Sequence, residues 1–140
     1  MREIKFRGWN EAKKIMYSAK ELGDDEIQIH PNGKGFFNAS SISHKLSEYY
    51  AHIIPMQFTG LKDKNGKDIY EGDILICSEY DSSDTGHRIV QTFQNAVVGF
   101  YNGSYYYFPK GNMNQPHQLL MYAHKAEVIG NIHENKDLLK

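Results

Sequence analysis

Only one cysteine, Cys77, occurs among the 140 residues, so no disulfide can form within the chain and a four-thiolate zinc site is excluded. Long apolar runs are missing as well, and the run from Ile74 to Cys77 is far too short to cross a bilayer. The first residues alternate charged and apolar side chains and contain no apolar stretch of signal-peptide length. These absences predict a cytoplasmic protein without a membrane segment.

Neither positive nor negative charge is in excess. The 16 basic and 17 acidic residues give a formal net charge of -1. This balance argues against avid, non-specific binding to DNA, because such binding depends on many phosphate contacts. A chain of 140 residues can bury one core without the help of metal or disulfides. We find no repeat and no linker, and therefore expect a single domain over residues 1–140.

Alternating apolar and polar residues predict a mainly β protein with short strands joined by turns. Asn65-Gly66 and Asn102-Gly103 are typical of tight reversals, because Asn and Gly tolerate positive φ. Several short strands between turn signals favour a small barrel or sandwich over a layered α/β fold. We expect strands near residues 4–9, 15–17, 27–30, 56–59, 74–77, 89–93, 96–101, 105–108, 119–122 and 128–132.

Helical signals are few. Apolar residues at helical spacing between residues 46 and 53, behind the potential cap Ser43, predict one short helix. Residues 135–139 predict a final helical turn, whereas the acidic residues 21–26 predict a loop. The chain should therefore contain at most one or two short helices.

Three stretches of the sequence form a longer pattern that chance does not explain. They are Arg2-Glu3-Ile4-Lys5-Phe6-Arg7-Gly8-Trp9, then Gln57-Phe58-Thr59-Gly60-Leu61-Lys62-Asp63-Lys64-Asn65-Gly66 with Ile69-Tyr70-Glu71-Gly72-Asp73-Ile74, and finally Val128-Ile129-Gly130-Asn131-Ile132. Together they resemble the YopX family of phage and prophage proteins.

The resemblance implies a small SH3-like barrel with additional strands. It also implies a phage or prophage protein that acts in the cytoplasm of a bacterial host, in a family without an established biochemical activity. Its motif residues are expected to have a structural role. They are Gly60, Asp63, Asn65, Gly66, Glu71, Gly72, Asp73, Gly130 and Asn131.

No catalytic, metal or cofactor signature emerges from the residues. The seven histidines lack carboxylates or thiolates at ligand spacing. The segment from Asp63 to Asp68 superficially resembles a calcium loop, but it lacks Gly at the sixth position and Glu at the twelfth. Cys77 ends an apolar run and is expected to be a small buried hydrophobe. We therefore expect neither an enzyme nor a bound cofactor.

Aromatic residues are the one excess, with ten Tyr, seven Phe and one Trp. In the run from Tyr105 to Phe108 alternate rings must face opposite sides of a strand. Tyr105 and Tyr107 are therefore candidates for a binding surface, since Tyr often anchors protein interfaces. Stacking on single-stranded nucleic acid is one alternative, although few basic residues lie nearby. Packing within the domain, without any binding role, is the other.

The N-terminal segment is the only basic patch, with six basic and two acidic residues between positions 1 and 20, a net of +4. If Ile4 and Phe6 face a core, Arg7 and Trp9 share the other face of their strand and become candidates for the binding surface. The alternative is that Trp9 is simply covered, and that the acidic residues that follow neutralise the patch.

These observations predict a non-catalytic binding module whose unknown partner is a protein. The alternative is a weak nucleic-acid-binding protein that uses the basic N-terminal segment and the Tyr-rich hairpin. An aromatic surplus with almost no net charge also predicts a homo-oligomer.

Overall fold

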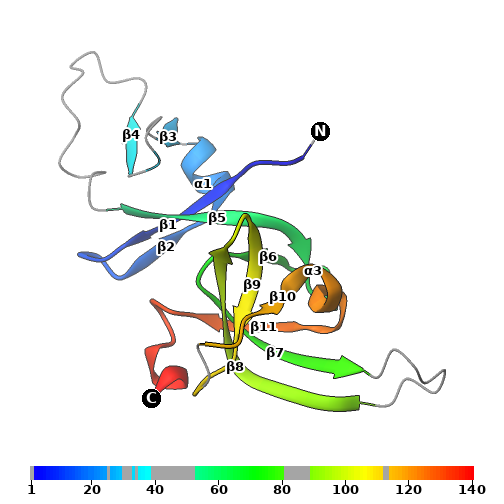
Figure 1. Ribbon diagram of the computed structural model, residues 1–140. Coiled ribbons are helices and arrows are strands. Elements are labelled where there is room, and N and C mark those ends of the chain that lie inside the picture. Colours follow the sequence, from blue (N-terminus) through cyan, green and yellow to red (C-terminus); the bar gives the residue numbers. More distant parts are fainter. Residues whose placement is uncertain are drawn as a thin grey trace. The chain divides into compact units, whose positions relative to one another are not determined.

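The computed structural model describes residues 2–24, 26–29, 33, 35–38, 53–80, 89–111 and 114–140. They belong to two compact units, unit 1 (residues 1–58) and unit 2 (residues 59–140) (Figure 1). Antiparallel strands dominate both units, so the prediction of a mainly β protein is confirmed. Within the described part of the chain, no helix has the length and hydropathy needed to span a membrane.

Unit 1 begins with a hairpin of β1 (Phe6–Asn10) and β2 (Ile15–Tyr17). The Asn10 side chain shapes the connecting turn, because its Oδ1 accepts the backbone N–H groups of Ala12 and Lys13 at 3.1 and 3.0 Å. On its other side β1 pairs with the first half of β5 (Ile53–Lys62), which continues into unit 2 as the neighbour of β6.

The predicted acidic loop at residues 21–26 is wrong, because helix α1 (Ala19–Asp24) covers most of it. Ser18 and Glu21 form a capping box that starts this helix. The Ser18 hydroxyl accepts the Glu21 N–H at 3.2 Å, and the Glu21 carboxylate accepts the Ser18 N–H at 2.7 Å. Two backbone donors are thereby satisfied at the helix start. The loop prediction rested on the acidic composition of the segment and overlooked this capping box.

The core of unit 1 is small. Leu22 of α1 packs with residues of β5 and of the two-stranded sheet β3 (Ile27–Ile29) and β4 (Phe36–Asn38). Gly8 of β1 lies against this core so closely that an added Cβ would stand 2.4 Å from the Ile53 side chain. The buried members are Leu22, Ile27, Phe36 and Ile53.

Unit 2 is a five-stranded antiparallel sheet with strand order β10-β9-β8-β7-β11. Its core lies on one side of the sheet, here called the inner face, where Leu75, Cys77, Val98 and Tyr107 are almost completely buried. The elements are β6 (Asp68–Tyr70), β7 (Asp73–Tyr80), β8 (Ile89–Tyr101), β9 (Ser104–Phe108), β10 (His117–Gln118), α3 (Leu119–Tyr122), the 3-10 turn η1 (Ala123–Lys125), β11 (Glu127–Asn131) and the 3-10 turn η2 (Lys136–Leu139).

The two strands predicted at residues 89–93 and 96–101 are one long strand, β8. An irregularity near Asn95, whose φ is 55°, shifts the register with β7 without ending the strand. The predicted hairpin at Asn102-Gly103 is confirmed, with positive φ of 46° and 80° at its two turn residues. Such a turn matches the twist of the strands that it joins.

The predicted strand at residues 119–122 is wrong, because these residues form helix α3. Leu119 and Ala123 are buried four residues apart, while Leu120 and Met121 between them are exposed. This is the spacing of one helix face, and the four-residue apolar run concealed it.

The predicted helical turn near the end of the chain is confirmed as η2. The helix predicted behind Ser43 lies largely outside the described residues, and Ile53, its last apolar residue, begins β5 instead. The SH3-like barrel and the single domain over residues 1–140 stay predictions.

Candidate functional site

Four strands of unit 2 bring aromatic and polar side chains together on the inner face of the sheet. Cys77 of β7 lies opposite Phe93 of β8, and Tyr107 of β9 lies opposite His117 of β10. Directly opposite residues of antiparallel strands point to the same side, so these four side chains become neighbours. The Phe93 ring is centred 4.6 Å from the His117 ring and 5.9 Å from the Tyr107 ring.

Glu79 connects this cluster through one carboxylate oxygen. The Tyr107 hydroxyl donates to Oε1 of Glu79, and Nδ1 of His117 lies 2.6 Å from the same oxygen. The His117 and Tyr107 rings are stacked, with centroids 5.2 Å apart and planes 15° apart. Hydrogen bonding and stacking together fix the orientation of His117, and Nδ1 becomes the nitrogen that faces Glu79.

The two other ionisable groups of the cluster are held neutral. Burial raises the pKa of the Cys77 thiol to about 11, against a smaller opposing effect of its hydrogen bond with Tyr107. Burial also raises the pKa of Tyr107, and the hydrogen bond to Glu79 acts in the same direction. A nucleophilic cysteine needs a lowered pKa, so Cys77 is an inert core residue, as its sequence context predicts.

An open pocket of about 230 Å³ lies beside His117. Phe93 and Pro109 give it an apolar wall, and two glutamines and a lysine add polar groups. Its lining consists of Gln91, Phe93, Pro109, Lys110, Gln115 and His117. Concave sites with an apolar wall and a few polar groups are the usual form of ligand pockets. We name this site the His117 pocket.

Sequence reasoning missed the His117 pocket. It considered His117 only as a metal ligand, and it gave Glu79, Phe93 and the two glutamines no role. The contact between Glu79 and His117 depends on the order of four strands and on the register shifts of β7 and β8, which no local pattern encodes. Among the described residues no group of three or more His, Cys, Asp or Glu could hold a metal ion.

The structure buries one of the two N-terminal site candidates. Trp9 is only 3% exposed, and its indole N–H donates to the Glu11 carboxylate at 2.5 Å. Of the two alternatives for Trp9, the structure therefore shows the covered one. Arg7, two positions away in β1, is half-buried. Only Arg7 of this pair keeps partial access to solvent.

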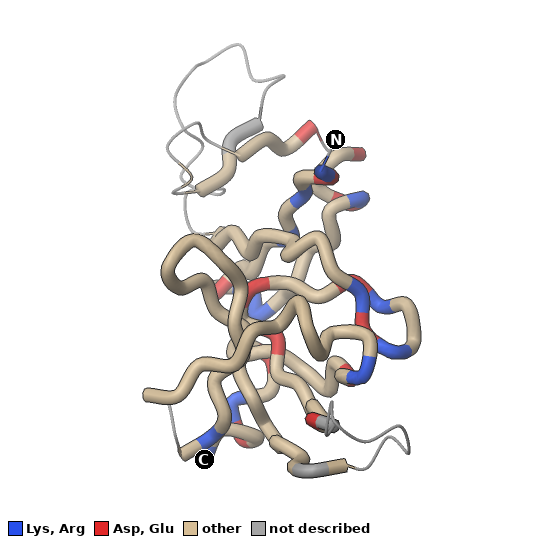
Figure 2. Tube along the Cα trace, turned by 45° about the vertical axis from the view of Figure 1, so that its right-hand side comes forward, with Lys and Arg blue, Asp and Glu red and all other residues tan. Residues whose placement is uncertain are grey.

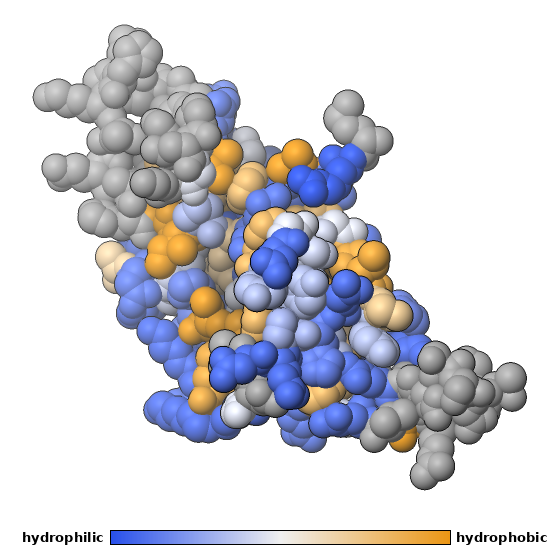
Figure 3. Space-filling view, in the orientation of Figure 1, coloured by the Kyte–Doolittle hydropathy of each residue, from blue (hydrophilic) through white to orange (hydrophobic). Residues whose placement is uncertain are grey.

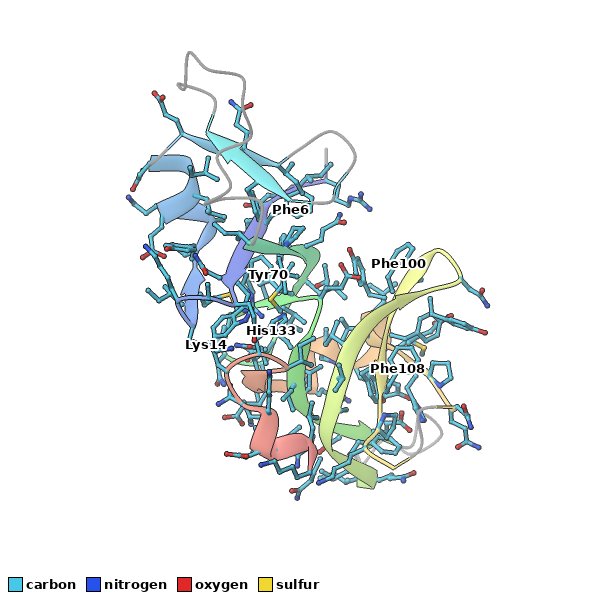
Figure 4. The ribbon with its side chains drawn as sticks, turned by 90° about the vertical axis from the view of Figure 1, so that its left-hand side faces the viewer. Phe6, Lys14, Tyr70, Phe100, Phe108 and His133 are labelled. Carbon is cyan, nitrogen blue, oxygen red and sulfur yellow. The ribbon has the colours of Figure 1, made fainter. Side chains whose placement is uncertain are left out.

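The Tyr-rich hairpin is also more buried than predicted. Tyr107 is 0% exposed and Tyr105 is half-buried against the core of unit 2, so Tyr107 cannot present its ring to a partner. The exposed rings of β8 are instead Phe100 (Figure 4) and Tyr101, at 57% and 49%. Alternation places Tyr105 and Tyr107 on the same, inner face, which explains why both are covered.

The basic N-terminal segment pairs with nearby acids. Lys5 lies 3.0 Å from Glu3, and Lys14 and Lys20 also pair with acidic residues three and four positions away. Blue and red lie close together near the N-terminus in Figure 2. The pairs found here are Lys5–Glu3, Lys14–Glu11 and Lys20–Asp24.

The motif residues of unit 2 hold its segments together. Asp63 is buried, and its Oδ1 accepts the N–H groups of Asn65 and Lys67 within the turn between β5 and β6. Its Oδ2 accepts the N–H of Val128 in β11 at 3.0 Å. Burial alone would raise the pKa of Asp63, but these backbone donors outweigh it and lower the pKa below its ordinary value. We call this arrangement the Asp63 staple.

The remaining motif residues make similar connections. Asp73 is fully buried and accepts the Tyr70 N–H at 2.7 Å, which closes the corner that contains Glu71 and Gly72. The backbone of Gly72 donates to the Val98 carbonyl and accepts from the Ile132 N–H, both at 2.9 Å. Positive φ angles between 79° and 85° occur at Gly60, Gly66 and Gly72. The Asn131 side chain accepts the N–H groups of His133 and Glu134. Gly130 packs against Asn135.

The fold and these buried connections define a class: a mainly β protein whose signature residues connect the strands and turns of unit 2. The model of the YopX family, described as YopX protein, matches residues 5–140. The chain therefore belongs to the YopX family.

A solved structure is similar to this chain over its whole length. The crystal structure of protein EF1440 from Enterococcus faecalis is 27% identical in sequence, with a TM-score of 0.56, and the match covers 100% of both chains. No match was found among the curated proteins.

Proposed function

We propose that this YopX protein is a non-catalytic binding module that takes its ligand in the His117 pocket. The observation that carries the proposal is the fixed orientation of His117 beside an open cavity. Glu79 and Tyr107 contact this ring, and the same ring lines the cavity. Pre-oriented polar groups lower the entropic cost of binding.

The chemistry around the pocket favours binding over catalysis. Cys77 and Tyr107 are held neutral and buried, so neither supplies an activated nucleophile. The pocket offers an apolar wall and hydrogen-bond donors, which suffice to select a ligand.

We favour a polypeptide partner over nucleic acid. Three cations of the N-terminal segment already pair with carboxylates, and Tyr107 is unavailable for stacking. A protein that holds a nucleic acid strand needs a row of cations along the backbone. We propose that the module acts in the cytoplasm of a bacterial host of phages, as the family resemblance implies.

A compound screen by NMR tests the proposal. Small polar and aromatic compounds are added to ¹⁵N-labelled protein, and we expect the largest shift changes at the residues that line the His117 pocket. The compounds should remain chemically unchanged after long incubation. Shift changes confined to residues 2–17, or conversion of a bound compound, would contradict the proposal.

A matched pair of variants locates the binding. Gln91 is exposed at the pocket, and Thr92 beside it in β8 points to the other side of the sheet, where its hydroxyl lies 3.1 Å from that of Ser78. Gln91→Trp should fill the pocket and abolish the shift changes. Thr92→Trp should leave them intact, because alternate residues of a strand face opposite sides.

A further inference from the structure

The lining of the His117 pocket contains an ammonium group and no carboxylate. Four of its six residues are polar, and the two glutamine amides among them can both donate and accept hydrogen bonds. The four are Gln91, Lys110, Gln115 and His117. A lining with a positive charge and no negative one is complementary to an anion.

Glu79 lies opposite Gln91 in the pairing of β7 with β8, but it is not one of the residues that line the pocket. Its Oε1 is occupied by the Tyr107 hydroxyl and by Nδ1 of His117. Nε2 is therefore the nitrogen of the His117 ring that is left to contact a ligand in the pocket.

Lys110 is the cationic residue of the lining. Its ammonium group lies 3.5 Å from the carbonyl oxygen of Leu138 and also donates to the backbone oxygen of Lys140. These contacts hold the charge beside η2 and restrain the side chain. Phe93 and Pro109 provide the apolar surface between Lys110 and His117 in the lining.

We propose that the His117 pocket binds a carboxylate that is attached to a small planar or apolar group. The inference deepens the proposed function and rests on it. The volume of about 230 Å³ is below the 300–1,000 Å³ typical of pockets for larger ligands, which favours a group of side-chain size over a nucleotide. The carboxylate can belong to a polypeptide or to a free organic acid.

The experiment is an NMR titration of the full chain with four probes. Benzoate and benzamide have nearly the same shape and differ in charge, phenyl phosphate carries the competing anion, and N-acetylphenylalanine represents the end of a polypeptide. We expect benzoate to bind at least about tenfold more tightly than benzamide, because a charge-assisted hydrogen bond is much stronger than a neutral one. Benzoate should also bind more tightly than phenyl phosphate. Tighter binding of N-acetylphenylalanine than of benzoate identifies a polypeptide source, and the reverse identifies a free acid.

Charge variants at Gln91, an exposed residue that lies opposite Glu79 in the pairing of β7 with β8, provide a second test. Gln91→Glu keeps the shape of the side chain and adds a negative charge, so it should weaken benzoate binding about tenfold. Gln91→Lys should strengthen it several-fold. Thr92→Glu, on the other side of the sheet, is the control and should leave the affinity within about twofold.

The outcomes separate this inference from the proposed function. Equal affinity for benzamide, or an unchanged affinity in Gln91→Glu, overturns the carboxylate assignment and leaves the binding module intact. Stronger binding of phenyl phosphate overturns it in favour of a phosphate ligand. If none of the four probes binds at the His117 pocket, the proposal of a carboxylate ligand is overturned. If the compound screen also produces no shift changes at the residues that line the pocket, the proposed binding function is overturned as well.

Discussion

The two oxygens of the Asp63 carboxylate serve different segments of unit 2. Oδ1 accepts the N–H groups of Asn65 and Lys67 in its own turn, whereas Oδ2 accepts the N–H of Val128 in β11. A buried carboxylate is normally costly, but three backbone donors compensate for the lost hydration. This explains why an acidic residue occupies an interior position.

Asp63→Asn is expected to lower the free energy of unfolding by about 2–3 kcal/mol at pH 7, as measured by urea denaturation. The amide offers a single oxygen and turns an N–H group toward a backbone donor. Asp68→Asn in the same turn is the control. Its partly exposed ion pair with Lys62 at 2.5 Å should be worth at most about 1 kcal/mol. Equal losses in the two variants would contradict the role of the staple.

The same carboxylate predicts how stability depends on pH. The folded structure lowers the pKa of Asp63, so its contribution is complete above the ordinary value for the unfolded chain, about 4. That contribution is lost as the pH falls through the lower pKa of the folded protein. The difference between the native protein and Asp63→Asn should therefore shrink below about pH 4.

The turn between β5 and β6 requires a residue that tolerates a positive φ angle at position 66. Gly66 has a φ of 79°, and an added Cβ would meet nothing within 4 Å. A substitution there is strained by the backbone conformation alone. Gly23 in α1 has equally open surroundings but no positive φ. The two glycines thus separate backbone strain from steric overlap.

Gly66→Val is expected to cost about 1–3 kcal/mol, because a β-branched residue is poorly tolerated at positive φ. Gly23→Ala should instead leave the stability unchanged or raise it by about 0.5–1 kcal/mol, as alanine favours helices. Thermal melting of both variants provides the measurement. Equal midpoints would show that the φ of Gly66 imposes no strain.

Short-range signals explain which elements could be predicted. The Asn102-Gly103 hairpin and η2 follow from neighbouring residues, and the structure contains both. Helix α3 was mistaken for a strand because a run of four apolar residues is too short to distinguish helical from strand periodicity. The helical spacing becomes visible only in the structure, where Leu119 and Ala123 are both buried. Helix α1 was missed although its capping box is present in the sequence at Ser18 and Glu21.

The whole-molecule features were least accessible to sequence reasoning. The motif residues were selected from the family resemblance, but their partners can lie far along the chain, as Val128 does from Asp63. The His117 pocket depends on strand order and on register shifts within β7 and β8. Trp9 and Tyr107 were selected for residue type, and only tertiary packing reveals that both are buried.

We also propose that the protein self-associates through exposed apolar side chains. Phe100 and Tyr101 lie next to the hairpin turn, and orange residues stand between blue ones on the face seen in Figure 3. Light scattering at micromolar concentration should give a mass above the 16.1 kDa of one chain. Phe100→Ser with Tyr101→Ser should lower that mass. A mass of one chain at every concentration would contradict the proposal.

The Asp63 staple has a consequence for the order in which unit 2 folds during synthesis. Hairpins such as β7–β8 and β8–β9 join neighbouring segments and can form while translation continues. Val128 is the partner of Asp63 and Ile132 is the partner of Gly72, and both leave the ribosome after the strands of the two hairpins. Until Val128 emerges, the Asp63 carboxylate lacks the backbone N–H that its Oδ2 accepts in the folded protein. Unit 2 should therefore reach its native state only after translation has passed these residues, and a stalled chain that ends before Val128 should remain sensitive to protease.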